Sequence, residues 1–337
     1  PTTACAAGRR RGEAAVANLS VTRRCERACP FCFAADERAT GPLDMSADVF
    51  EAALDFLERS GVPDARLLGG EPMLHPAFAS LADRALERGF ALTVMTGGLV
   101  HEAAVAHLTA LPAERVKVFL NATPEAPAGT ALGVSQRLLC ETLGERVELG
   151  MTLLAPDDDP SFLLEWVAQY GLAPRVRIGV AHPVLGGHNR SADARDLKAI
   201  GATIERFVAA ARAAGVTVVF DCGLTPCMFS EGFAAAHPEV IETVGTRCGP
   251  IVDILPEGAA IACYALADVV RIPLGESATR HGLIATLEEH LDRLAPAAGT
   301  YELCETCAHH ATGRCNGGCR ARQGLRFRAS AAPTGEG

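Results

Sequence analysis

The chain has 337 residues, 49% of them hydrophobic, and a formal net charge of −9. This length suits one large domain with a small one, or two domains of medium size. The negative charge and an aromatic content of only 5% argue against a nucleic-acid-binding protein. No apolar run reaches about 18 residues and no signal-peptide pattern precedes the first predicted strand, so we expect a cytoplasmic protein without a membrane span.

Short β-rich runs alternate with helical patterns over the first two thirds of the chain. The predicted strands are nearly continuous apolar runs, typical of parallel strands covered on both faces, and they lie at 15–21, 65–70, 91–97, 115–122, 146–154, 175–181 and 216–222. Helices are predicted at 46–61, 77–89 and 102–111, with Ser46 as an N-cap and with Gly61 and Gly89 at the helix ends. This order predicts an α/β fold, either a parallel barrel or an open wound sheet.

The character of the sequence changes after about residue 222. Gly, Pro and Cys interrupt short segments, and residues 251–264 are predicted to form a β-hairpin. The run LCETCAHHATGRCNGGCRA has almost no apolar pattern, so we expect it to fold around something other than a hydrophobic core. We therefore divide the chain into an N-terminal tail (1–14), a first domain (15–222), a bridging segment (223–247), a cysteine-rich domain (248–328) and a disordered tail (329–337).

Thirteen cysteines are many for a chain with no predicted export signal, and in a reducing compartment they indicate metal ligands more than disulfides. Cys25, Cys29 and Cys32 lie just past the first predicted strand, whereas Cys5 and Cys140 stand alone and are interpreted as incidental. Three thiolates leave one iron of a four-iron cluster open to a substrate or cofactor. In parallel α/β folds ligands bind at the carboxyl ends of strands, which is where this motif lies.

The C-x3-C-x2-C spacing, with Phe31 before the last cysteine, resembles the motif of the radical S-adenosylmethionine (SAM) enzymes. A second similarity is GGEP at the end of the next strand, which matches the GGE motif of that family and comprises Gly69, Gly70, Glu71 and Pro72. The third strand ends in TGG, similar to the family's Thr-Asn-Gly but with Gly97 in place of Asn.

This resemblance covers residues 15 to about 220 and implies a partial (β/α)6 barrel whose three cysteines hold a 4Fe-4S cluster. By the same resemblance the open iron chelates SAM, and electron transfer then produces a 5′-deoxyadenosyl radical that removes a hydrogen atom from a substrate carbon. Glycine in the GGE motif lets the backbone approach the SAM amino group, and Glu71 is placed to accept from that cation. Phe31, Thr96 and Asn121 are further expected SAM contacts.

The C-terminal cysteines resemble the SPASM domain, a carrier of auxiliary 4Fe-4S clusters. The resemblance assigns Cys248, Cys263 and Cys319 to the first auxiliary cluster, with Cys227 as a better upstream partner than Cys222. It assigns the second cluster to Cys304, Cys307 and Cys315, and no cysteine follows Cys319 in this sequence to complete it. Taken alone, the four terminal cysteines suit tetrahedral zinc equally well.

Several side chains keep more than one interpretation. Cys222 is a hydrogen-atom donor to a substrate radical, a spare ligand or an inert thiol. Tyr264 follows Cys263 where sulfatase-maturating relatives carry a basic aspartate, so it either packs beside a cluster or acts as the base. His309 and His310 could replace the missing thiolate.

Loop and tail residues are similarly open. The basic segment 320–328 either offsets the charge of thiolate-ligated clusters or is a solvated face. Polar residues past strand ends are either substrate contacts or solvated loop positions, and they are Asp157, Asp158, Asp159, His182, His188 and Asn189.

Two classes of substrate remain by resemblance. SPASM enzymes crosslink, oxidise or epimerise ribosomal peptides and proteins, whereas others of the broader auxiliary-cluster group dehydrogenate or epimerise small sugars and aminocyclitols. Only about fifteen residues precede the first strand, so we expect a leader-binding domain to be absent and a separate recognition protein to supply that role. A flavodoxin or ferredoxin is the expected reducing partner.

Overall fold

The computed structural model describes residues 16–124, 129–242, 244, 248–298 and 304–323, and every structural statement below concerns these residues. The tails predicted at 1–14 and 329–337, the thiol of Cys5 and most of the basic segment 320–328 lie outside them.

Ten strands form one sheet in the spatial order β10-β9-β8-β1-β2-β3-β4-β5-β6-β7. Strands β1 to β7 pair in parallel with their neighbours, which confirms the predicted parallel α/β architecture. The strands are β1 (Asn18–Thr22), β2 (Asp64–Gly69), β3 (Ala91–Thr96), β4 (Val116–Asn121), β5 (Val147–Leu153), β6 (Arg175–Val180), β7 (Thr217–Phe220), β8 (Asp253–Ile254), β9 (Ala259–Ile261) and β10 (Ile272–Pro273).

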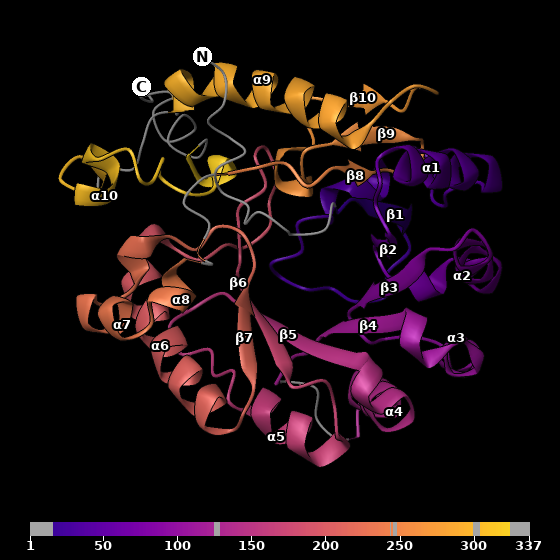
Figure 1. Cartoon of the computed structure of the whole chain (residues 1–337), viewed down its shortest axis with the longest axis horizontal. Coiled ribbons are helices and arrows are strands. Elements are labelled where there is room, and N and C mark those ends of the chain that lie inside the picture. Colours follow the sequence, from indigo (N-terminus) through magenta and orange to yellow (C-terminus); the bar gives the residue numbers. More distant parts are fainter. Residues whose placement is uncertain (1–15, 125–128, 243, 245–247, 299–303, 324–337) are drawn as a thin grey trace, which may run out of the picture.

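The sheet is curved and open, with β7 and β10 at its edges, and Figure 1 shows the helices of the first domain around its outer face. The helices are α1 (Ala47–Arg59), α2 (Phe78–Glu87), α3 (Glu102–Ala110), α4 (Ala131–Leu143), α5 (Phe162–Tyr170), α6 (Leu197–Ala213), α7 (Glu231–Ala236), α8 (Pro238–Ile241), α9 (Arg280–Ala298) and α10 (Ala308–Ala311). Among the described residues, we find no helix of the length and apolar character needed to cross a membrane.

The two faces of the sheet differ in chemistry. In β4, Val118 and Leu120 are fully buried, while the alternate residues Phe119 and Asn121 are only half-buried. Because side chains alternate between faces along a strand, the first set packs under the helices and the second faces the inside of the partial barrel. Along these nearly continuous apolar runs, burial therefore alternates from one residue to the next. One set of residues packs in the core, and the other lines the interior of the barrel.

Helix ends follow local sequence signals. The Ser46 hydroxyl accepts from the Val49 backbone N–H at 3.3 Å, so the predicted N-cap of α1 is confirmed. Gly61 and Gly89 have φ of +62° and +92°, the left-handed conformation that glycine adopts most readily after a helix.

The predicted hairpin at 251–264 is confirmed as β8 and β9, which pair antiparallel. Strand β8 also pairs in parallel with β1, and the Asn18 side chain donates to Asp253 Oδ1 at 2.6 Å. The sheet of the first domain thus continues into the cysteine-rich region, across the boundary that we predicted at 223–247.

Candidate functional site

The loop after β1 carries Cys25, Cys29 and Cys32, and all three residues are half-buried. The Cys32 N–H donates to the Cys29 carbonyl at 3.1 Å, so the second and third cysteines share a tight turn. Cys25 Sγ lies 3.8 Å from the Arg27 carbonyl oxygen. Three thiols in one short loop at the carboxyl end of a parallel strand fit the donor set of a 4Fe-4S cluster with one open iron.

The glycines of GGEP bring β2 against this cysteine loop. The Gly70 N–H donates to the Thr22 carbonyl at 2.7 Å, and the Glu71 N–H donates to the Arg24 carbonyl at 2.6 Å. A Cβ on Gly69 would lie 2.1 Å from the Thr22 carbonyl oxygen, and one on Gly70 would lie 2.2 Å from that of Arg24. Both distances are impossible for a real side chain, so these positions admit only glycine without a backbone shift.

Glu71 joins the ends of β2 and β3. Its side chain is 2% exposed, and Oε2 accepts from Thr96 Oγ1 at 2.7 Å and from the Gly97 N–H at 3.0 Å. Oε1 accepts from the Met73 N–H at 3.4 Å. Burial raises the pKa of Glu71 to about 7, opposed by these hydrogen bonds and by the positive charge of Arg27. The carboxyl group therefore sits in a buried polar network beside the cysteine loop, with Pro72 buried next to it.

Arg27 explains the glycine in TGG. Its Nη1 donates to the Gly97 carbonyl at 2.5 Å and to the Asn121 carbonyl at 3.3 Å. A Cβ on Gly97 would lie 2.8 Å from Nη1 and 2.9 Å from Cδ of Arg27. Gly97 thus makes room for an arginine that links the cysteine loop to the ends of β3 and β4. Sequence reasoning missed Arg27, although its position between the first two cysteines was a signal.

Phe31 connects the cysteine loop with the segment after β6. Its carbonyl accepts from Asn189 Nδ2 at 3.3 Å, while the same amide nitrogen donates to the His182 carbonyl at 2.7 Å. Asn189 Oδ1 accepts from the Val184 N–H at 2.8 Å. The Asn189 side chain is therefore engaged in shaping its own loop.

Tyr264 lies beside the third cysteine of the loop. It is 5% exposed, its ring centroid is 5.3 Å from that of Phe33, and Cys32 packs against the same apolar cluster. Its hydroxyl forms a hydrogen bond with Ser20 Oγ, and burial raises the pKa of the phenol. Such a buried phenol stays protonated at neutral pH, so its surroundings favour the packing interpretation over a base.

Charged side chains gather on the inner face at β4 to β7. The Arg177 guanidinium carbon lies 4.3 Å from the ring centroid of Phe119, and Nη1 is 3.3 Å from Asp221 Oδ1. Two glycines make room for these side chains. A Cβ on Gly150 would lie 2.3 Å from the Phe119 ring, and a Cβ on Gly179 would lie 3.0 Å from Asp221 Oδ2. Sequence reasoning missed this group, which the alternation of arginine in RVRIGV could have revealed.

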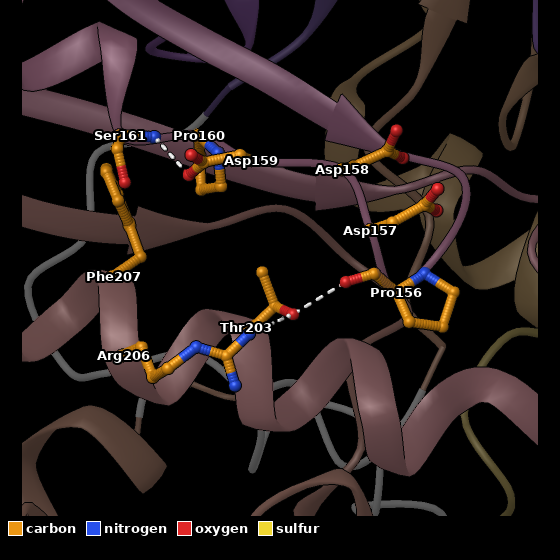
Figure 2. A pocket seen from close by; sticks show the side chains of 9 residues that line it. All are labelled: Pro156, Asp157, Asp158, Asp159, Pro160, Ser161, Thr203, Arg206 and Phe207. Atoms are coloured by element: carbon orange, nitrogen blue, oxygen red, sulfur yellow. Dashed lines mark hydrogen bonds between the residues drawn. The ribbon is translucent and has the colours of Figure 1, made fainter.

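The aspartates after β5 lie in a surface pocket between residues 156–161 and α6 (Figure 2). Asp158 Oδ2 accepts from the backbone N–H groups of Leu154 and Ala155, and Asp159 Oδ1 accepts from that of Ser161. Hydrogen bonds from the side chain and the backbone N–H of Ser161 lower the pKa of Asp159. The carboxylates of Asp158 and Asp159 thus stabilise the conformation of the loop, which favours their interpretation as loop positions over substrate contacts.

One group of thiols includes Cys263, which follows β9, and Cys222, which follows β7. Burial raises the pKa of Cys263 well above its usual value, and the nearby thiols of Cys248, Cys319 and Cys222 raise it further. Cys319 is in turn among the groups that raise the pKa of Cys222. Cys222, rather than Cys227, is therefore among the thiols whose charges act on Cys263.

Cationic and N–H groups lie next to this set. Burial raises the pKa of Cys319, and the backbone N–H groups of Arg322 and Ala321 and the charge of Arg322 oppose that shift in part. Arg322 is 5% exposed and donates to the carbonyls of Ala181 and Ala192. This part of the basic segment is thus buried beside a cysteine.

A second group of thiols surrounds α10. The Cys307 N–H donates to the Cys304 carbonyl at 3.2 Å, and the Cys315 N–H donates to the His309 carbonyl at 3.1 Å. The pKa of Cys315 is raised by burial and by the charges of the nearby Cys227 and Cys307. Cys227 therefore belongs spatially to this second group.

All twelve described cysteines are thiols, and among the described residues no three His, Cys, Asp or Glu side chains converge as one metal ion would require. A 4Fe-4S cluster binds each thiolate through a separate iron, so its ligands need not converge on one point. Cys140 is fully buried in α4, where burial raises its pKa to about 12, consistent with an incidental thiol.

Comparisons with known proteins agree with this geometry. Residues 19–138 match the family model of the radical SAM superfamily. A PqqA peptide cyclase of Xanthomonas campestris pv. campestris is 28% identical over 335 residues, covering 90% of this chain and 81% of that protein. An S-adenosylmethionine-dependent nucleotide dehydratase of Selenomonas ruminantium is 37% identical over 82 residues, which cover 24% of this chain and 29% of that protein.

Solved structures share the fold. Streptococcus suis SuiB bound to S-adenosylmethionine aligns with a TM-score of 0.63 at 17% identity, covering 91% of this chain and 73% of that one. The protein anSMEcpe with bound AdoMet aligns with a TM-score of 0.62 at 14% identity, covering 91% of this chain and 86% of that one. These alignments confirm the predicted barrel architecture.

Proposed function

We propose that this chain, whose residues 19–138 place it in the radical SAM superfamily, modifies a ribosomal peptide or protein by abstracting a hydrogen atom from a carbon. Crosslinking, oxidation and epimerisation are the reactions in scope, and the enzyme would be an oxidoreductase or a peptide-modifying enzyme of the cytoplasm. The observation that carries the peptide assignment is the similarity to PqqA peptide cyclase over 90% of the chain.

The cysteine loop would hold the SAM-binding cluster. Cys25, Cys29 and Cys32 are the proposed ligands, and their thiol chemistry and half-buried position fit that role. When bound, the cluster and SAM supply a 5′-deoxyadenosyl radical. An external one-electron donor such as flavodoxin or ferredoxin would reduce the cluster.

The chain's own residues would bind and orient SAM at the ends of β1 to β4. The Gly69–Gly70 backbone runs beside the cysteine loop, and Glu71 supplies an acceptor for the SAM ammonium group. Thr96 fixes the Glu71 carboxylate through its hydroxyl at 2.7 Å. Phe31, Pro72 and Asn121 are the remaining proposed contacts.

The inner face of the barrel would receive the substrate. Its half-buried polar side chains, with Arg177 and Asp221 among them, offer hydrogen bonds to a peptide backbone or side chain. Enclosure by β4 to β7 would keep water and other hydrogen donors from the radical. A separate leader-peptide recognition protein would deliver the substrate.

The test combines reduced, reconstituted enzyme, SAM and candidate peptides bearing deuterium at defined carbons. We expect deuterium in 5′-deoxyadenosine and a mass change in one peptide, both detected by mass spectrometry. The variant with Cys25, Cys29 and Cys32 all changed to Ala should form no 5′-deoxyadenosine. Full activity of that variant would refute the cluster assignment, and deuterium transfer from small sugars alone would refute the peptide substrate.

A further inference from the structure

The loop after β7 carries two cysteines, Cys222 and Cys227, only five positions apart. Gly223, with φ of +89°, follows the first of them, and the second lies inside the 3₁₀ turn Pro226–Met228. Cys222 lies at the end of β7, where its carbonyl is 2.9 Å from His182 Nε2. A Cβ on Gly223 would lie 1.9 Å from the His182 ring, so this ring packs directly on the glycine and fixes the start of the loop.

The far end of the loop packs against the C-terminal cysteine segment. A Cβ on Gly318 would lie 2.6 Å from Cγ2 of Thr225, and 3.9 Å from the Gly223 carbonyl oxygen. Thr225 Oγ1 lies 3.2 Å from Cys227 Sγ, so the same contact positions Cys227. The glycine at 318 therefore allows the loop after β7 and the segment before Cys319 to touch.

The adjacent glycine ties the same contact to the remaining cysteines. The Gly317 N–H donates to Cys315 Sγ at 3.4 Å, and a Cβ on Gly317 would lie 3.9 Å from Cys304 Sγ. Cys307 shares a turn with Cys304. Four thiols from two distant segments are thus brought to one place, and one N–H already donates to a sulfur.

We propose that Cys227, Cys304, Cys307 and Cys315 form one complete four-thiolate site for a 4Fe-4S cluster. This assignment leaves Cys222 as the upstream ligand that completes the set of Cys248, Cys263 and Cys319. The inference rests on the proposed function insofar as it assumes that these thiols carry iron–sulfur clusters. It replaces the division expected from the sequence, which placed Cys227 in the first set and left the second with three thiolates.

The proposal has two chemical consequences. The second cluster then has four cysteine ligands, so neither His309 nor His310 is needed as a ligand. Cys222, once bound to iron, has no S–H bond and cannot donate a hydrogen atom to a substrate radical. The loop 222–227 becomes a direct covalent connection between two redox centres.

The experiment removes cysteines in pairs, because three thiolates can suffice to hold a four-iron cluster. The wild-type chain should bind about 12 iron atoms, four for each of three clusters. The variant Cys227→Ala with Cys315→Ala removes two ligands from one proposed site and should retain about 8. The variant Cys227→Ala with Cys263→Ala removes one ligand from each site, and should retain about 12 if three thiolates suffice or about 4 if they do not.

The opposite pattern overturns the proposal. If Cys227 instead shares a cluster with Cys263, the two double variants exchange their expected iron contents. The Cys227/Cys263 variant then retains about 8 iron atoms, and the Cys227/Cys315 variant does not. The matching pairs on Cys222 run in the reverse sense: Cys222/Cys263 should retain about 8, and Cys222/Cys315 should not. About 8 iron with one zinc in the wild-type chain would also refute the second cluster.

The control variant is Cys140→Ala, which alters a buried thiol of α4 and should leave the iron content unchanged. Mössbauer spectra report cluster type, and circular dichroism shows whether each variant folds. The formation of 5′-deoxyadenosine from SAM depends on residues 25–32, and so does the proposed peptide reaction. A failure of peptide modification with intact iron counts would therefore refute the proposed function and leave this ligand assignment standing.

Discussion

At the scale of single residues, the contacts of Glu71 give the most detailed support for SAM binding. Its buried carboxyl accepts from a hydroxyl and two backbone N–H groups, and it lies against the cysteine loop. A carboxyl in that position can accept from an ammonium group of a ligand while its own place is fixed by the protein.

Removing this carboxyl should weaken SAM binding. We expect Glu71→Ala to cost about 1.5–3 kcal/mol of SAM binding free energy, the range for a hydrogen bond to a charged group. Iron content should stay unchanged, because none of the proposed ligands is altered. Titration calorimetry measures the affinity, and Glu87→Ala, an exposed glutamate of α2, is the control. An unaltered affinity would remove Glu71 from the site.

Gly97 and Arg27 form a second residue-scale pair. Gly97→Ala places a methyl group about where the Arg27 side chain crosses, so the arginine must move and lose its bonds to the Gly97 and Asn121 carbonyls. We expect this overpacking to cost about 1–3 kcal/mol of stability. The double variant Arg27→Ala with Gly97→Ala should show no further loss beyond Arg27→Ala alone, as measured by chemical denaturation. Additive losses would show that the two residues do not interact.

At the scale of elements, the turn after β2 depends on its glycines. Gly70 and Glu71 donate their N–H groups to the Thr22 and Arg24 carbonyls, which leaves no space for a Cβ at position 70. The close approach of this turn to the backbone holds the cysteine loop in place beside it.

Gly70→Ala should therefore displace the cysteine loop. We expect the variant to lose about four iron atoms, those of the SAM-binding cluster, and to keep the rest. Iron analysis and 5′-deoxyadenosine formation measure this. Gly232→Ala is the matched control, because no atom lies within 4 Å of its Cβ position and it sits inside α7. Full iron content in Gly70→Ala would contradict the steric argument.

At the scale of the whole molecule, the C-terminal cysteine segment docks on the barrel through Arg322. This side chain is 5% exposed and donates to the carbonyls of Ala181 and Ala192, both after β6. It also lies beside Cys319. This buried cation thus links the C-terminal cysteine segment to the segment after β6.

Replacing Arg322 by Met should keep the volume but leave two carbonyls without their donor. We expect a loss of about 1.5–3 kcal/mol of stability, because hydrogen bonds from a charged group are removed. Thermal denaturation measures the loss, and Arg314→Met at an exposed position is the control. A midpoint equal to that of the control would show that the segment docks by other contacts.

The sequence by itself determined the class of the protein and predicted its first candidate site. Strands and helices that alternate with period-specific patterns allow few architectures, and C-x3-C-x2-C with GGEP at the next strand end is a local signal. Ser46, Gly61 and Gly89 each act at the end of a single helix through local contacts, so their roles could also be predicted without tertiary contacts. These features depend on residues that are close in sequence, and for that reason they could be predicted from the sequence.

Only the tertiary structure decided which distant side chains meet. Cys222 and Cys227 are near neighbours in sequence, yet Gly223 packs on His182 after β6, whereas Thr225, which contacts Cys227, packs against Gly318 of the C-terminal segment. Arg27 beside Gly97 and Arg177 beside Asp221 join segments about 44 to 70 positions apart. Spacing along a chain carries no information about such contacts, since they depend on how the folded sheet brings its strand ends and loops together.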